Sequence, residues 1–293
     1  MQYYNENTIL FLNGNFIKAS EAKTDLYSQT LHYGLGVFEG IRSYEIASEA
    51  KIFKPKEHYE RLIYSASKMN IKFNYTVQEL TDATYQVLEK NNLKSAYIRP
   101  MVYMGADMTL VPSEEVNIMI AVWEWGKYLG NSLIKATISE YQRPNPKSCY
   151  VDAKVCGHYI NSVLATTDAR SKGFGEPILL DSKGNIAEGG GSNFFYEKDG
   201  KLFTPPIGNI LPGITRATII ELAKKMGYEV EEKLFTFEDL KKIKPDVAFF
   251  TGTAAEVGGI ESIDDLVFET NWESTIAFKL SKAYQNLVTG KEN

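Results

Sequence analysis

The sequence predicts a two-domain α+β protein, and three observations lead to this prediction. The chain has 293 residues, which exceeds the roughly 100–150 residues of a typical single domain. Helical and strand patterns both recur along the whole chain. A glycine-bearing stretch at 126–133, GKYLGNSL, separates two such mixtures. We therefore expect an N-terminal α+β domain at 1–123, a connector at 124–136 and a C-terminal α/β domain at 137–293.

The N-terminal domain begins with a predicted hairpin. ILFLNGNFIKA at 9–19 has two short apolar runs around Asn13-Gly14, a dipeptide that favours a tight hairpin turn. Amphipathic helices are predicted next, and two strands follow them. The helices are PKEHYERLIYSASKMNI and TVQELTDATYQVLEKNNL, and the strands are SAYIRPMVYM and VNIMIAVWEW.

The C-terminal domain begins with IKATISEYQR, whose alternation predicts a strand. A short helix is predicted from Asn161 to Arg170, ended by Gly173 and Gly175. The hairpin LLDSKGNIAEG, a helix through ATIIELAKKMG with Gly227 at its C-terminal cap, and a terminal helix in NWESTIAFKLSKAYQNLVTG complete the domain. The sequence shows no internal repeat or low-complexity segment.

The stretch from Glu188 to Arg216 places a carboxylate at one end and a predicted anion site at the other. Gly213, Ile214 and Thr215 come at the N-terminus of the predicted helix, where unpaired N–H groups and the helix dipole favour an anion such as phosphate. An ordinary capped helix has the same local pattern.

Lys154 is the only cation among the small and apolar residues from Tyr150 to Gly157. Because an apolar setting disfavours the charged amine, we expect its pKa to fall and the neutral amine to act as a nucleophile or base. A solvated surface lysine is the alternative.

Taken together, the segments resemble the branched-chain amino acid aminotransferases. These are fold-type IV (class IV) enzymes that depend on pyridoxal phosphate and share the fold of D-amino acid aminotransferase. The family signature corresponds here to Glu188, Asn193, Phe194, Phe195, Thr204, Gly213 and Arg216. The other matching blocks are LHYGLGVFEGIRSY at 31–44, EHYERL at 57–62, AYIRPMVYMG at 96–105, WGKYLG at 125–130, KVCGHYINS at 154–162 and TGTAAEV at 251–257. The blocks span nearly the whole chain in the family's order, so the resemblance is far more specific than any one motif.

The resemblance implies a pyridoxal 5′-phosphate site in a cleft between the two domains, with the lysine on the C-terminal one. Lys154 looks like the lysine that binds the cofactor covalently and transfers the proton. Glu188 looks like the partner of the pyridine nitrogen, and Tyr159 like the tyrosine that bonds the 3′ oxygen. Leu211 would pack on the ring. The phosphate would be held by Arg61, Ile214, Thr215 and Thr253, and Gly252 would also bind the cofactor. For Arg61 an ion pair on the helix surface, with Glu57 or Glu60, is the alternative.

Substrate recognition follows from the same resemblance. The small residues Gly252, Thr253 and Ala254 would hold the α-carboxylate with their N–H groups. Tyr97 and Arg99 alternate along a predicted strand and therefore share a face. In the family, the arginine reads the side-chain carboxylate of glutamate. An apolar pocket for leucine, isoleucine and valine would be shaped by Tyr33, Phe38, Trp125 and Tyr128; core packing is the alternative for these aromatic residues.

The chain departs from the family pattern after Lys154, where Cys156, Gly157 and His158 replace two glycines and an asparagine. Gly189, Gly190 and Gly191 lack the strand and helix of a nucleotide-binding loop, and we expect them to let backbone approach the cofactor or substrate closely. With only three histidines and no ligand-spaced cluster, we expect no metal site.

Composition is typical of a cytoplasmic enzyme. The formal charge is 32 minus 37, or −5, with no long basic run, which argues against nucleic acid as a partner. Two cysteines give no disulfide framework. The chain has neither a signal-peptide pattern nor an apolar run near the roughly 20 residues of a membrane helix.

The predicted function is therefore a ping-pong exchange of the amino group between branched-chain L-amino acids and 2-oxoglutarate. The resemblance implies at least a homodimer, with Tyr33 and the loop from Met104 to Leu110 reaching the neighbour's active site. The alternatives keep the cofactor: a D-amino acid aminotransferase, an R-selective amine transaminase or an aminodeoxychorismate lyase. A non-catalytic paralogue that binds a phosphate ligand is a further alternative.

Overall fold

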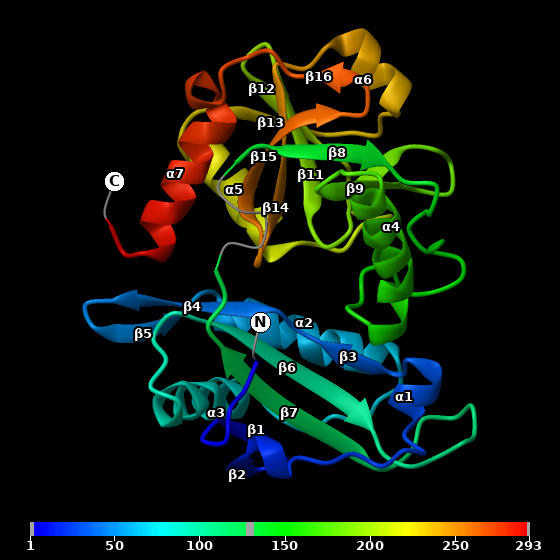
Figure 1. Ribbon diagram of the computed structural model, residues 1–293, viewed down its shortest axis with the longest axis vertical. Helices are drawn as coiled ribbons and strands as arrows, with labels where there is room; N and C mark the ends of the chain where they lie inside the picture. The colour runs from blue at the N-terminus through cyan, green and yellow to red at the C-terminus, as the bar shows by residue number, and fades with distance from the viewer. Residues whose placement is uncertain (1–2, 127–131, 292–293) are drawn as a thin grey trace. The chain divides into compact units, whose positions relative to one another are not determined.

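The computed structural model describes residues 3–126 and 132–291. The chain folds into two compact units. The N-terminal unit comprises Met1–Gly126 and Ala153–His158, and the C-terminal unit comprises Lys127–Asp152 and Tyr159–Asn293. Each unit has a sheet of its own with helices packed on it (Figure 1), which agrees with the predicted α+β class.

The described part of the N-terminal unit contains a seven-stranded sheet of order β2-β1-β7-β6-β4-β5, in which β3 also pairs with β6. Its strands are β1 (Ile9–Leu12), β2 (Asn15–Lys18), β3 (Gly36–Phe38), β4 (Ile41–Ile46), β5 (Glu49–Ile52), β6 (Ala96–Met104) and β7 (Val116–Trp123). The predicted first hairpin is confirmed. β1 and β2 pair antiparallel, and Asn13 and Gly14 have φ of 49° and 88°, the positive values that a two-residue hairpin turn requires.

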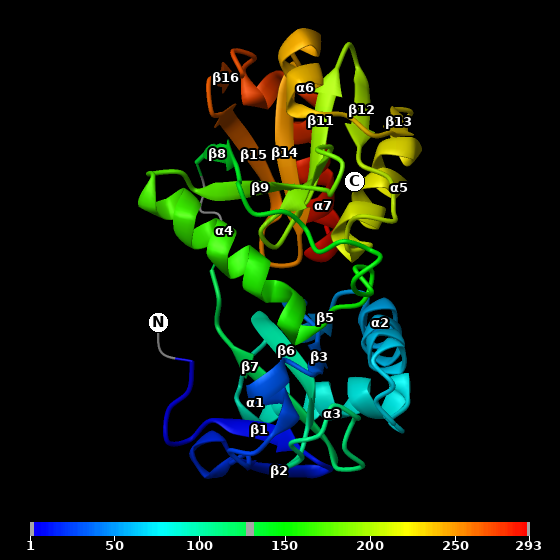
Figure 2. The ribbon, with the colours of Figure 1, turned by 90° about the vertical axis from the view of Figure 1, so that its right-hand side faces the viewer.

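Two long helices, α2 (Pro55–Lys68) and α3 (Val77–Lys90), confirm the predicted amphipathic pair. α3 begins with a capping box between Thr76 and Glu79. Both helices lie on the same side of the sheet in Figure 2. Their buried faces meet the strands in one core, to which Leu62, Leu80 and Ile98 contribute fully buried side chains. A short helix, α1 (Gln29–Tyr33), precedes β3.

The described part of the C-terminal unit contains a nine-stranded sheet of order β10-β9-β8-β15-β14-β11-β12-β13, with β16 beside β15. Its strands are β8 (Ile134–Ile138), β9 (Glu176–Leu180), β10 (Ile186–Gly189), β11 (Asn193–Lys198), β12 (Lys201–Thr204), β13 (Glu229–Glu232), β14 (Val247–Gly252), β15 (Glu256–Ile263) and β16 (Leu266–Val267). The hairpin predicted at 179–189 is confirmed by the antiparallel pairing of β9 with β10.

Between residues 132 and 291, four α-helices cover this second sheet: α4 (Tyr159–Ser171), α5 (Ile214–Lys225), α6 (Phe237–Ile243) and α7 (Ile276–Val288). In Figure 1, α7 and α4 lie on opposite sides of the unit. Phe194 and Tyr196 belong to one core cluster, while Phe195 stacks on Phe249 with ring centroids 5.0 Å apart. Both faces of β11 are therefore buried, because successive side chains point to opposite faces. No helix in the described ranges is both long and apolar enough to span a bilayer.

The observed division of the chain differs from the predicted one in two places. Residues 134–136, expected in the connector, belong to β8 and pair with β9 and β15. Lys154, expected in the C-terminal domain, belongs to the N-terminal unit with residues 153–158. The reason is local bonding: Val155 forms a bridge with Val37, and the Gly157 N–H donates to the Gly34 carbonyl at 3.1 Å. Local sequence patterns do not reveal such contacts.

Candidate active site

Lys154 is held by its backbone to the N-terminal unit. Its N–H donates to Ser65 Oγ at 2.9 Å, and its carbonyl accepts from the Phe38 N–H at 3.1 Å. The Lys154 Nζ lies 4.8 Å from the centroid of the Phe38 ring. The side chain therefore starts from a fixed point and extends along an aromatic face, which attracts its ammonium form.

Arg99 lies in an aromatic cage on β6. Its Cζ is 4.7 Å from the centroid of Phe38, 5.4 Å from that of Tyr97 and 6.0 Å from that of Trp123. Arg99 Nη2 donates to the Tyr97 hydroxyl at 3.1 Å, so the prediction that these two residues share a face is confirmed. Trp125 packs edge-on against Tyr97 at 4.5 Å. Among the described residues, Arg99 forms no ion pair with a carboxylate, so the cage presents a cation with aromatic walls.

Gly40 explains why the motif GVFEG ends in glycine. A Cβ at this position would overlap the hydroxyl of Tyr97. Since that hydroxyl accepts from Arg99, the absence of a side chain at Gly40 allows Tyr97 to sit where it holds Arg99.

Arg61 forms a buried ion pair that local sequence patterns did not indicate. Its Nε donates to Glu39 Oε1 at 2.7 Å and its Nη2 to Glu39 Oε2 at 2.9 Å. His58 Nδ1 donates to Oε2 of the same carboxylate at 2.7 Å. The surface ion pair considered for Arg61 is wrong, since Glu60 pairs with Lys56 instead. His58 lies less than one helical turn before Arg61 on α2, whereas Glu39 precedes strands β4 and β5. Only the fold brings Glu39 to the other two residues.

Glu188 is a buried carboxylate on β10 in the C-terminal unit. Asn193 Nδ2 donates to its Oε2 at 2.9 Å, and the Leu211 N–H approaches the same oxygen at 3.3 Å. Arg143 Nε lies 2.7 Å from Oε1, although the N–H does not point along this line. A carboxyl group that meets donors on both oxygens has the bonding of the ionised form. Arg143 was missed because no local pattern distinguishes it.

The N-terminus of α5 has the features of the predicted anion site. α5 begins at Ile214, and its cap residue Gly213 offers no side-chain hydrogen bond. Within the described ranges, no acceptor meets the N–H groups of Ile214 and Thr215. A Cβ at Gly213 would overlap Asn193 Oδ1, so this turn requires glycine. The helix start therefore offers two backbone donors and the buried Thr215 to an anion.

Arg216, the basic residue of the signature, has a structural role. Its side chain is buried, and it donates to the Pro205 carbonyl at 2.9 Å and to Glu232 at 2.5 Å. Arg216 therefore joins α5 to β13 and to the segment after β12.

The glycine-rich turns of the C-terminal unit are tight for different reasons. Gly252 ends β14, and Thr253, Ala254 and Ala255 form the turn into β15. A Cβ at Gly189 would lie 2.6 Å from Ser192 Oγ, and one at Gly190 would lie 2.7 Å from Thr166 Oγ1. Gly189 and Gly190 therefore make room for side chains of this chain, whereas the prediction had them facing cofactor or substrate.

Three tyrosines were also predicted to contribute to the site. Tyr33 is exposed at the end of α1, and its hydroxyl donates to the Met108 carbonyl at 3.0 Å. Tyr33 also lines a pocket of about 370 Å³ with Leu110, Val155 and His158. Tyr159 is the first residue of α4. Tyr128 lies outside the described residues.

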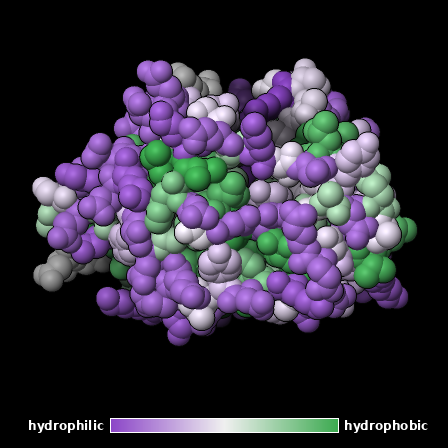
Figure 3. Space-filling view, turned by 90° about the horizontal axis from the view of Figure 1, so that it is seen from below, coloured by the Kyte–Doolittle hydropathy of each residue, from purple (hydrophilic) through white to green (hydrophobic). Residues whose placement is uncertain are grey.

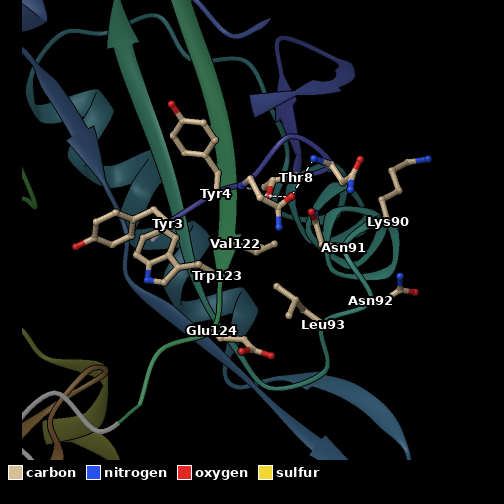
Figure 4. A pocket seen from close by; sticks show the side chains of 12 residues that line it. Tyr3, Tyr4, Thr8, Lys90, Asn91, Asn92, Leu93, Val122, Trp123 and Glu124 are labelled. Atoms are coloured by element: carbon tan, nitrogen blue, oxygen red, sulfur yellow. Dashed lines mark hydrogen bonds between the residues drawn. The ribbon is translucent and has the colours of Figure 1, made fainter. Parts of the chain in front are cut away.

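A larger pocket of about 500 Å³ lies elsewhere on the N-terminal unit and contains none of the predicted site residues. Figure 4 shows Tyr3 beside Trp123 at this pocket, with Lys90 and Asn92 on the opposite side. Trp123 thus contacts Tyr3 as well as the Tyr97 ring of the cage. The pocket and the Arg99 cage are separated by this indole.

Histidine, cysteine and carboxylate side chains are the usual protein ligands of metal ions. Within the described ranges, no group of three or more of them is arranged to hold a metal ion. Burial raises the pKa of the Cys156 thiol to about 11, so this cysteine stays protonated near neutral pH and is a poor nucleophile.

Comparison with known proteins identifies the family. Residues 36–263 match the model of the family described as amino-transferase class IV. The chain is 40% identical to a branched-chain-amino-acid aminotransferase of Pseudomonas aeruginosa, over 99% of this chain and 96% of that protein. It is 38% identical to that of Escherichia coli, over 96% and 93%.

Solved structures agree. A branched-chain aminotransferase from Thermoproteus uzoniensis, solved with norvaline, has a TM-score of 0.93 at 36% identity and covers 98% of this chain and 96% of its own. The Escherichia coli enzyme has a TM-score of 0.93 at 38% identity, with the same coverage. The chain therefore belongs to the class IV aminotransferases, among the branched-chain-amino-acid aminotransferases.

Proposed function

We propose that this protein transfers the α-amino group of L-leucine, L-isoleucine or L-valine reversibly to 2-oxoglutarate, using pyridoxal 5′-phosphate. One observation carries the substrate assignment. The Lys154 Nζ and the Arg99 Cζ lie 4.8 and 4.7 Å from the centroid of the same ring, Phe38. A reactive amine and a cation thus share one aromatic wall. This arrangement supports a pocket that accepts an apolar side chain on the wall and a side-chain carboxylate at the cation.

The donor set of the chain fits the cofactor. The open N-terminus of α5 suits a phosphate dianion. The buried carboxylate of Glu188, which pairs with Arg143 and accepts from Asn193, suits a protonated ring nitrogen. A branched-chain amino acid aminotransferase from Thermobaculum terrenum, solved in its PLP-form, has a TM-score of 0.89 at 29% identity and covers 99% of this chain and 96% of its own, which supports this fit.

When bound, pyridoxal phosphate supplies an electron-withdrawing ring that stabilises the charge left when the Cα–H bond breaks. We propose that Lys154 would hold the cofactor covalently and that its Nζ would move the proton at Cα. Glu188 keeps the proton on the ring nitrogen, Leu211 packs on the ring, and Tyr159 bonds the 3′ oxygen. Thr215, Thr253, Arg61 and the N–H group of Ile214 would hold the phosphate.

The substrate would be oriented by backbone N–H groups, aromatic rings and a guanidinium. We propose that the N–H groups of the turn at 252–254 hold the α-carboxylate, with Thr253 and Ala254 facing it. Phe38, Tyr97 and Trp125 form the apolar wall, and Arg99 binds the side-chain carboxylate of glutamate. The arrangement is supported by the packing of these rings around Arg99.

We further propose a cytoplasmic homodimer. Both cysteines are free, which suits a reducing compartment. Large apolar side chains are exposed on the N-terminal unit, among them Leu31, Leu110 and Val111, and apolar patches interrupt the hydrophilic face in Figure 3. The Tyr33 hydroxyl bonds Met108, so the two segments assigned to the neighbour's active site contact each other within one chain.

A half-reaction screen tests the function. The purified pyridoxal form is mixed with L- and D-amino acids and with amines, and its visible absorbance is followed. We expect L-leucine, L-isoleucine, L-valine and L-glutamate to convert it, and their D-isomers and (R)-1-phenylethylamine to leave it unchanged. Conversion by D-alanine in place of L-leucine would identify a D-amino acid aminotransferase. Pyruvate release from aminodeoxychorismate without a 2-oxo acid would identify the lyase.

Replacing Arg99 with alanine should affect glutamate more than leucine. We expect kcat/KM for glutamate to fall about 100-fold, because a charged hydrogen bond to a carboxylate contributes roughly 1.5–3 kcal/mol. For leucine, which has no second carboxylate, the loss should stay below about fivefold. L-leucine on the same variant serves as the control, and Arg99→Lys should recover part of the glutamate activity. Equal losses with both substrates would remove Arg99 from side-chain recognition.

A further inference from the structure

We propose that Glu39 is the positioning residue of the cofactor's phosphate site: it holds the guanidinium of Arg61 in the orientation that receives the phosphate. This inference rests on the proposed function, since it requires Arg61 to bind that phosphate. Glu39 itself touches neither cofactor nor substrate in this scheme. It acts through Arg61.

The geometry of Glu39 is that of an orienting group. The Glu39 side chain is fully buried between β3 and β4, and its backbone N–H is fixed to the Pro100 carbonyl at 2.9 Å. Both carboxylate oxygens contact one edge of Arg61, through Nε and Nη2. A bidentate contact of this kind fixes the plane of the guanidinium and therefore the direction in which its other N–H groups point.

His58 completes the support from the preceding turn of α2. Burial lowers the pKa of His58, which outweighs the opposing effect of the Glu39 charge, so the ring is neutral near pH 7. A neutral imidazole that meets a carboxylate at 2.7 Å through Nδ1 carries its proton there. His58 thus fixes the carboxylate without adding charge.

The charge of Glu39 allows its effect on the geometry of Arg61 to be distinguished from its electrostatic effect on phosphate binding. Burial alone would raise the pKa of Glu39, but Arg61 and His58 outweigh it and hold this pKa far below its usual range. Glu39 is therefore ionised, and its negative charge offsets that of Arg61. By charge alone Glu39 would weaken the binding of a phosphate. A net gain in phosphate binding from Glu39 therefore requires that it act through geometry.

The test compares two ligands on the full-length protein freed of cofactor. Pyridoxine 5′-phosphate and pyridoxine share a ring and differ in the phosphate, and neither has the aldehyde that reacts with Lys154. The dissociation constant of pyridoxine divided by that of pyridoxine 5′-phosphate, here called the phosphate ratio, isolates the phosphate. We expect Glu39→Gln to reduce the phosphate ratio about tenfold, which corresponds to roughly one charged hydrogen bond. A phosphate ratio that is unchanged or raised in the folded variant would overturn the proposal.

A double-mutant cycle separates positioning from general damage. In an Arg61→Lys background, which keeps the charge and loses the bidentate contact, Glu39→Gln should change the phosphate ratio by less than about twofold. An equal reduction in both backgrounds would show that Glu39 does not act through Arg61. Glu49→Gln, which breaks the exposed pair of Glu49 with Lys51 on β5, serves as the matched control and should leave the phosphate ratio at the wild-type value.

Glu39→Gln leaves the buried Arg61 without its counter-ion and can prevent folding. If the Glu39→Gln protein shows no cooperative unfolding transition, two substitutions at His58 test the proposal in its place. An asparagine amide at this position would place an N–H near that of the imidazole Nδ1, whereas leucine has no donor. We therefore expect His58→Asn to keep the phosphate ratio near wild type and His58→Leu to reduce it. Equal phosphate ratios in this pair would overturn the proposal. If wild-type protein itself bound both ligands equally, the proposed phosphate site would fail instead.

Discussion

Replacing Lys154 with alanine should give a colourless protein whose transamination rate falls by at least about 10⁴-fold. The expected loss is the largest of any substitution, because one side chain supplies both the covalent attachment and the base. General acid–base catalysis alone contributes roughly 10²–10⁴-fold, and the covalent role adds to it. Visible absorbance after reconstitution with excess pyridoxal phosphate and single-turnover kinetics with L-leucine measure the two losses separately.

Lys68→Ala is a matched control for this experiment. The Lys68 Nζ also lies over an aromatic ring, that of Tyr64, at 5.2 Å in the same unit. The Lys68 substitution should change neither colour nor turnover. If the Lys154→Ala protein stayed yellow, and borohydride reduction fixed the cofactor to another lysine, the assignment of Lys154 would be wrong.

Replacing Glu188 with glutamine should slow removal of the Cα proton by about 10²–10³-fold while leaving phosphate affinity within a few-fold. Glutamine keeps the shape of the side chain but removes the charge that favours a proton on the ring nitrogen. It also turns an N–H₂ group toward the guanidinium of Arg143, which forms an ion pair with Glu188, or toward the Asn193 amide, which donates to it. A primary isotope effect measured with α-deuterated leucine should therefore increase, because the proton transfer becomes rate-limiting.

Glu197→Gln is the matched control for Glu188. Glu197 is also a buried glutamate in the C-terminal unit, on β11, and it accepts from the Ala277 N–H at 3.0 Å. The Glu197→Gln variant tests whether loss of a buried carboxylate elsewhere in the unit slows removal of the Cα proton. We expect its rate to equal that of the wild type. Unchanged turnover in Glu188→Gln would remove the electronic role assigned to this residue.

Local patterns in the sequence predicted most of the fold. The Asn13-Gly14 turn and the capping residues of α3 act within a few positions, so the first hairpin and α3 were predictable from the chain itself. The placement of Lys154 was not. It depends on bonds to Ser65 and Phe38, which are remote in sequence and which only the folded chain brings into contact.

The residues of the candidate site also fall into those that the sequence predicted and those that it did not. Residue types that match the family motif, such as Glu188 and Arg99, were predictable from the motif. Their supporting partners were not, because Arg143 is a lone arginine before a proline, and helix α4 and strand β9 separate it from Glu188 in the chain. Glu39 was overlooked for a related reason. Within GVFEG a glutamate gives no signal that it will be buried, and its partner Arg61 lies on a helix reached after two further strands.

The excursion of residues 153–158 into the N-terminal unit has a consequence for how the protein is made. Ala153 and Val155 fill the core that α2, α3 and the first sheet enclose, yet they leave the ribosome only after β8 has been synthesised. A fragment that ends at Gly126 would lack these two residues, so the first unit to be translated cannot complete its own interior early. The segment that completes this interior also carries Lys154. Completion of the N-terminal core and placement of the reactive amine are therefore one event during maturation.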